Sequence, residues 1–123
     1  MKKVIILTFI LMTVSLSESL SLKDYIDIRS KKDKASNKTI SLYIYGLGQG
    51  LFWANGELRN KYGINLYCEP DKLVLNSDNY VHILDDAIEK SKDSEFFKEY
   101  QDKDVLGLLL LEELQHVFPC HKK

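Results

Sequence analysis

One apolar stripe constrains the fold of this sequence more than any other feature. Between Ile40 and Leu58, apolar residues recur every three or four positions, which is the spacing of one helical face over about five turns. Ser36 or Asn37 can cap the start of such a helix, and Gly63 can end it. The stripe therefore predicts one long amphipathic helix. Its members are Ile40, Ile44, Leu47, Leu51, Ala54 and Leu58.

Four glycines, at positions 46, 48, 50 and 56, lie inside this predicted helix. Relative to alanine they would cost about 3–4 kcal/mol together. Gly46, Gly50 and Ala54 are four residues apart, so they would form a helix-packing stripe that another helix approaches closely, in the core or at a dimer seam. Phe52 and Trp53 lie near this stripe and can supply a large buried apolar area. Alternatively, some of the glycines mark a kink or a break.

A nucleotide-binding turn is the competing interpretation of these glycines. "SLYIY" could form a strand before Gly-x-Gly-x-Gly, and Glu69 could be the acidic residue that follows about 20 residues later. However, the third glycine is not where the dinucleotide fingerprint needs it, and the chain is too short for two βαβαβ halves. We therefore expect a helix and no nucleotide cofactor.

The N-terminus has the pattern of a secretory signal peptide. Two lysines precede an apolar run from Val4 to Val14, and Ser17 and Ser19 offer small residues for cleavage. This run is shorter than the roughly 20 residues that span a bilayer. We expect residues 1–19 to be removed and residues 20–123 to form one soluble domain, periplasmic in an organism with two membranes. A buried N-terminal core helix is the alternative.

Charge and cysteine content narrow the function of this domain. Loss of two lysines and one glutamate with the signal peptide changes the formal net charge from −1 to −2, which gives no reason to expect nucleic acid or a membrane surface as a partner. Cys68 and Cys120 are the only cysteines, and in an oxidising compartment an even pair most simply forms a disulfide. A catalytic thiol and a metal site are the alternatives, although no zinc-binding spacing is present.

Helical periodicity recurs in the rest of the chain. A short helix is expected within residues 21–31, a second over 80–88 and a largely buried one over 105–118. Residues 30–38 have the composition of a polar connector, and residues 89–104 fit a short helix or an ordered loop. The sequence thus predicts an all-α fold, a small single-domain bundle of four or five helices with one disulfide.

The chain offers no convincing catalytic constellation. His82, His116 and His121 are its only histidines, and Glu113 with His116 forms a single E-x-x-H where a di-iron bundle needs two. No serine or cysteine has a supported catalytic partner. We therefore expect no catalytic residues, no metal ligands and no cofactor.

Three motifs follow one another along the chain. A tyrosine-rich segment carries G-x-x-x-G-x-x-x-A at Gly46, Gly50 and Ala54, C-x-P begins at Cys68, and F-P-C ends at Cys120. In this order, behind a signal peptide, they resemble the Rap/Tai family of type VI secretion immunity proteins. The resemblance implies a periplasmic, often homodimeric helical inhibitor. It would bind a peptidoglycan-cleaving amidase injected by a neighbouring cell and block its active site.

The matched residues are mainly scaffold, so the partner-binding surface lies elsewhere. The segment "DSEFFKEYQDKD" combines aromatic and acidic side chains, and a few aromatic anchors usually dominate binding energy. We expect Glu95, Phe96, Phe97 and Tyr100 to contact the toxin; a core-facing aromatic pair on a short helix is the alternative. The second functional hypothesis is a small periplasmic chaperone or structural accessory protein without a toxin partner.

Overall fold

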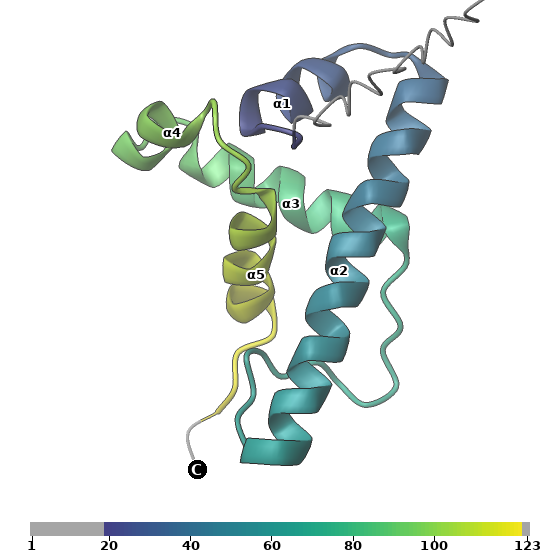
Figure 1. Cartoon of the computed structure of the whole chain (residues 1–123), viewed down its shortest axis with the longest axis vertical. Coiled ribbons are helices and arrows are strands. Elements are labelled where there is room, and N and C mark those ends of the chain that lie inside the picture. Colours follow the sequence, from purple (N-terminus) through teal and green to yellow (C-terminus); the bar gives the residue numbers. More distant parts are fainter. Residues whose placement is uncertain (1–18, 122–123) are drawn as a thin grey trace, which may run out of the picture.

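The computed structural model describes residues 19–121, which form five helices (Figure 1). No strand occurs within this range, so the predicted all-α fold is confirmed. Apart from Ser19, the predicted signal peptide lies outside the described residues. The helices are α1 (Leu22–Ser30), α2 (Lys34–Tyr62), α3 (Ser77–Ser91), α4 (Glu95–Tyr100) and α5 (Leu106–Val117).

The longest helix, α2, runs along the long axis of the molecule (Figure 1). Asp33 caps its start by accepting a hydrogen bond from the Ser36 N–H at 3.0 Å. The helix therefore begins ahead of the predicted caps, and residues 34–38 are helical rather than part of a connector. Gly63 ends it in the left-handed conformation, φ 65°, as predicted. Because α2 is continuous across its glycines, the break and the strand–turn interpretations are wrong.

The helix α3 crosses α2, and α5 packs against α3 (Figure 1). A reciprocal capping box starts α3: the Asn76 side chain accepts from the Asn79 N–H, and the Asn79 side chain accepts from the Asn76 N–H. The start of α5 has no side-chain cap, so its position depends on burial of its leucines.

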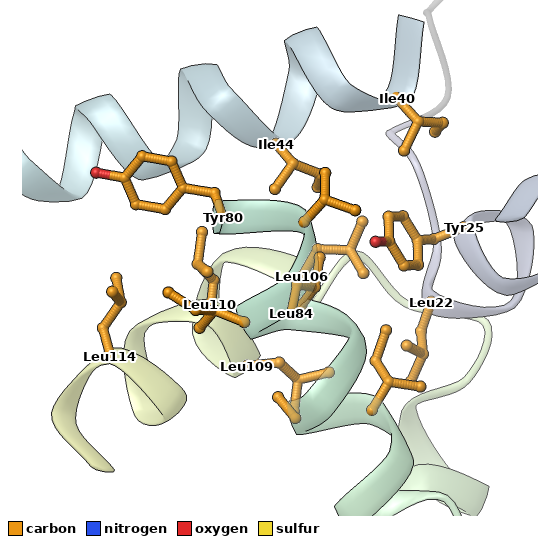
Figure 2. Packing of buried hydrophobic residues seen from close by; sticks show 14 of the residues in the cluster. Leu22, Tyr25, Ile40, Ile44, Tyr80, Leu84, Leu106, Leu109, Leu110 and Leu114 are labelled. Carbon is orange, nitrogen blue, oxygen red and sulfur yellow. The ribbon is translucent and has the colours of Figure 1, made fainter. Parts of the chain in front are cut away.

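The core lies where α1, α2, α3 and α5 meet (Figure 2). Apolar side chains from all four helices point into this region and are fully shielded from solvent, which is the main source of the free energy of folding. The fully buried side chains are Leu22, Tyr25, Ile44, Tyr67, Tyr80, Leu84, Leu106, Leu110 and Leu114.

A polar cluster holds α1 against this core. The Tyr25 hydroxyl donates to one oxygen of Asp85 at 2.7 Å, and the Arg29 guanidinium donates to the other at 2.8 Å. Arg29 also donates to the Asn37 side-chain oxygen at 2.7 Å. Burial, with the neighbouring Asp85, raises the pKa of Tyr25, so the phenol stays protonated and can donate. These bonds connect α1 to both α2 and α3.

Candidate functional site

The predicted disulfide is present. The sulfurs of Cys68 and Cys120 are bonded, with 4.9 Å between the two Cα atoms. The Cys68 N–H also donates to the Phe118 carbonyl at 2.8 Å, so the C-terminal segment is fixed to the connector of residues 64–76. Because both thiols are consumed, the alternatives of a catalytic cysteine and of a cysteine metal ligand are wrong.

The glycine stripe of α2 faces solvent. A Cβ atom added at Gly46 or Gly50 would meet no neighbouring heavy atom within 4 Å, and Ala54 is exposed. Packing in the core therefore does not explain the stripe, and that part of the prediction is wrong. The other predicted role, a dimer seam, stays a prediction.

Gly48 is the glycine that makes a close approach. A Cβ atom there would lie 2.5 Å from the ring of Tyr80, which is buried. Gly48 lies one turn from buried Ile44 and two turns from buried Asn55, so it belongs to the core side of α2. Glycine is required at this position because the Tyr80 ring rests directly on the helix backbone.

The solvent side of α2 is apolar. We define the exposed face of α2 by the side chains of Leu42, Tyr43, Tyr45, Phe52 and Trp53. Trp53 is 70% exposed and Phe52 is 41% exposed, so the prediction that they supply a large buried area is wrong for Trp53 and holds only in part for Phe52. No charged residue occurs from position 39 to 56. These side chains are spread over about half of the circumference of α2, because Tyr43 and Phe52 are nine residues apart, or about two and a half turns.

Buried Asn55 fixes the connector to α2. Its amide group donates to the Tyr67 carbonyl at 2.9 Å, and its side-chain oxygen accepts from the Leu66 N–H at 2.7 Å. One side chain thus satisfies two backbone groups that have no helix or sheet to pair with. With the disulfide at Cys68, this clamp fixes the path of the connector beside α2.

A cleft of about 410 Å³ lies between α2 and the connector. A smaller cavity of about 120 Å³, which Tyr45, Gln49 and Tyr80 help to line, adjoins it. The residues common to both are Phe52, Glu69, Leu73 and Val74. The residues that line only the larger cleft are Trp53, Asn55, Gly56, Glu57, Arg59, Asn60, Pro70 and Asp71.

Glu69 gives this cleft its electrostatic character. One of its carboxylate oxygens is buried and has no hydrogen-bond partner within residues 19–121, and burial raises the pKa of Glu69. The nearby Tyr67 hydroxyl is also buried without a partner. Burial and the negative charge of Glu69 raise the pKa of Tyr80 to about 12. Glu69 and Tyr67 therefore leave one buried acceptor and one buried donor without a partner near each other, behind the surface of the cleft.

The predicted partner-binding residues lie on α4, which follows the end of α3 that is farther from α2 (Figure 1). Phe96 and Phe97 are partly buried against the core, and the Phe96 and Tyr100 rings stack with centroids 4.7 Å apart. Glu95 is exposed and forms an ion pair with Lys98 at 2.8 Å. The structure therefore groups the four residues together on a short helix but does not bring them near the exposed face of α2.

Sequence reasoning missed that Asn55, Glu69 and Val74 line one cleft. Asn55 comes one position after Ala54, a member of the predicted apolar stripe. Its hydrogen-bond partners lie 11 and 12 residues away in the sequence, so no local motif marks it. In the sequence, Glu69 has a role only as the acidic residue of the rejected dinucleotide fingerprint. Its position beside a cysteine indicates that a disulfide would fix it in space, but not which segment it would face.

The described residues contain no group of three or more His, Cys, Asp or Glu side chains that could hold a metal ion. Glu113, from the single E-x-x-H, is buried and forms an ion pair with Lys90, while His116 is exposed. Over the same residues, no helix is both long and apolar enough to cross a membrane.

Comparisons with protein-family models, curated proteins and solved structures found no match for this chain.

Proposed function

We propose that this chain is a periplasmic immunity protein, similar to the Rap/Tai proteins, that binds and inhibits a peptidoglycan amidase delivered by type VI secretion. The observation that carries the proposal is the charge-free, aromatic exposed face of α2 on a disulfide-linked helical scaffold. Patches of this kind mark protein-binding surfaces, and tryptophan and tyrosine are frequent anchors there. The three ordered motifs in the sequence give independent support. Inhibition requires only that the bound chain cover the amidase active site, with no catalysis of its own.

The test begins with a search for an exported amidase gene beside the gene for this chain, and that amidase is then co-expressed with and without this chain. Cells that carry both proteins should survive, cells with the amidase alone should lyse, and the purified proteins should co-elute in size-exclusion chromatography. Equal lysis in both strains, with no complex, would contradict the proposal. Trp53→Ala and Phe97→Ala variants then decide which surface is used: the first should lose the complex if α2 binds the amidase, and the second if α4 does.

Export is part of the same proposal, and the disulfide between Cys68 and Cys120 supports it because such bonds persist in oxidising compartments. Mass spectrometry of a periplasmic extract should detect an oxidised chain that begins near residue 20. A full-length chain retained in the membrane fraction would contradict this assignment.

A homodimer is the proposed explanation of the open glycine stripe. Gly46, Gly50 and Ala54 lie to one side of Trp53 on α2, with nothing from the same chain packed on the two glycines. Gly50→Leu should leave the chain helical by circular dichroism but monomeric by light scattering. A wild type that is monomeric at high micromolar concentration would contradict the dimer.

The exposure of Leu42 and Trp53 also favours the second candidate, a periplasmic chaperone, because unfolded chains bind to apolar surfaces. A chaperone should suppress aggregation of a heat-unfolded, unrelated protein in a light-scattering assay. An immunity protein should fail in that assay yet form a one-to-one complex with a single folded amidase.

A further inference from the structure

The start of α1 lies directly after the predicted cleavage site for signal peptidase. Cleavage needs small residues at the first and third positions before the cut. Serines at positions 15, 17, 19 and 21 satisfy this rule in three registers, with cuts after Ser17, Ser19 or Ser21. The structure distinguishes among these registers, because they differ in which residues remain to begin the fold.

Leu20 and Ser21 are part of the folded domain. The Leu20 side chain packs against the core, and the Ser21 hydroxyl caps α1 by accepting from the Asp24 N–H at 3.1 Å. The next residue, Leu22, is fully buried. A cut after Ser21 would remove both the cap and the Leu20 contact, and each of them stabilises the domain. A cut that preserves the fold therefore falls ahead of Leu20.

A polar pocket of about 490 Å³ lies beside the peptide bond between Ser19 and Leu20. Ser19 and Ser21 both line this pocket, so the nitrogen of Leu20, which lies between them in the chain, is at its wall. An amino group created at Leu20 would therefore be held at the pocket by the chain itself. The other residues that line the pocket are Lys23, Asp24 and Asp102.

Two backbone hydrogen bonds hold Asp102 beside the start of α1. The Leu22 N–H donates to the Lys103 carbonyl at 3.0 Å, and the Lys23 N–H donates to the Gln101 carbonyl at 2.8 Å. Because these two acceptors flank Asp102 in the sequence, its backbone is fixed on both sides against the first turn of α1. The segment that follows the cut is thus attached to the loop of residues 101–105, between α4 and α5.

The charged side chains around this pocket leave one negative charge unbalanced. Asp24 and Asp102 are opposed there only by Lys23. Neither Asp102 nor Lys23 forms an ion pair within residues 19–121. A new positive charge at the start of α1 would be unfavourable for the helix dipole, and a carboxylate beside it offsets that cost. The pocket thus provides a counter-charge for an amino group at Leu20.

We propose that the exported chain is cut between Ser19 and Leu20, and that the amino group released there pairs with Asp102 and holds α1 against the loop of residues 101–105. Hydrolysis adds water across the peptide bond: the Ser19 carbonyl carbon gains the hydroxyl and the Leu20 nitrogen gains the hydrogen. At neutral pH the amine then takes up a proton. The inference rests on the export part of the proposed function and is independent of the amidase.

The first test is the N-terminal residue of the exported chain, determined by mass spectrometry of the protein purified from the periplasm. We expect this residue to be Leu20. A chain that begins at residue 18 or 22 would overturn the proposal while export stands. A chain that keeps residues 1–19 would contradict export and this inference together, so the two failures are distinguishable.

The second test is a thermal-unfolding cycle on the oxidised chain that begins at Leu20. Its α-amino group is acetylated at about pH 6.5, where lysine amines stay protonated and unreactive. Acetylation should lower the unfolding midpoint by about 2–4 °C, the size expected for a surface ion pair. In Asp102→Asn it should cause no such loss, because the amine has no acceptor there. Asp104→Asn, exposed in the same loop but outside the pocket, is the matched control and should keep the full response.

The pH dependence of this cycle gives a readout that a merely structural role of Asp102 would not produce. Pairing raises the pKa of the amine in the folded chain, so its contribution is complete below the ordinary value of about 8 and is lost as the pH rises through the raised value. The free and acetylated chains should therefore differ at about pH 6.5 and agree at about pH 9.5. Equal losses in wild type and Asp102→Asn, or a difference that persists at the higher pH, would each overturn the pairing.

Discussion

Both sides of α2 carry glycine and large apolar residues, yet the rest of the chain covers only one of them. On the covered side, Gly48 lies under the ring of Tyr80 and Asn55 binds the connector. On the other side, Gly50 has no neighbour and Trp53 extends into solvent. The difference teaches that composition does not decide which face of such a helix becomes core. The contacts that another segment makes with the helix decide it, and the uncovered face is left free to bind.

Asn55→Ala should have the largest effect on stability. The substitution leaves the Leu66 N–H and the Tyr67 carbonyl without partners, at a combined cost of about 2–4 kcal/mol. Urea unfolding of the oxidised protein measures the loss. Asn60→Ala, at an exposed position of the same helix, is the control and should stay within about 0.5 kcal/mol of wild type. Equal stabilities of the two variants would show that the clamp contributes nothing.

Gly48→Ala should have the second-largest effect on stability. A Cβ atom at this position overlaps the Tyr80 ring at 2.5 Å, and Tyr80 is too deeply buried to move freely. Overpacking of this kind costs about 1–3 kcal/mol, although alanine is the better helix former. Thermal unfolding followed by circular dichroism is a suitable measurement. A variant more stable than wild type would mean that the covered side of α2 accommodates an added Cβ atom as easily as the uncovered side does.

Gly50→Ala should change stability in the opposite direction. Nothing opposes a Cβ atom there, so the substitution should stabilise the isolated chain by about 0.5–1 kcal/mol through helix propensity. The free energy of unfolding should be measured at low micromolar protein concentration, where dimer formation contributes little to stability. Destabilisation under those conditions would indicate an unseen contact on the uncovered side and weaken the comparison.

Trp53→Ala should have the smallest effect on folding. Its side chain is 70% exposed, so the free energy of unfolding should stay within about 0.5 kcal/mol of wild type. The same substitution should sharply weaken partner binding, because exposed tryptophans dominate many interfaces. Calorimetric unfolding and a binding titration on one preparation test both statements. A large loss of stability would place Trp53 among the structural residues.

Much of the fold could be predicted from the sequence because its determinants are local. The spacing of Ile40, Ile44 and Leu47 indicates a helix, Gly63 ends it through a left-handed conformation, and an even pair of cysteines behind a predicted signal peptide indicates a disulfide. The apolar stripe also identified the covered side of α2 approximately. Its error was one position, where Ala54 is exposed and Asn55 is buried.

The candidate site was less predictable because it depends on distant segments. The fate of Gly46 and Gly50 depends on where α3 crosses α2, and helical periodicity cannot specify that crossing. The cleft at Glu69 exists because the connector returns along α2, fixed by Asn55 and by a disulfide to the end of the chain. The presence of Glu69 beside Cys68 in the sequence does not indicate that path.

The disulfide divides the chain into a ring and an arm. The cysteines are 52 residues apart, and the loop they close contains α3, α4 and α5, whereas α1 and α2 lie outside it. In the oxidised unfolded state the ring is constrained and the arm is not. One wall of the cleft belongs to the ring and the other to the arm. A local unfolding event that detaches α2 would therefore abolish the recognition surface, while the disulfide would still constrain α3 and α5. Partner binding thus depends on the part of the molecule that the disulfide constrains least.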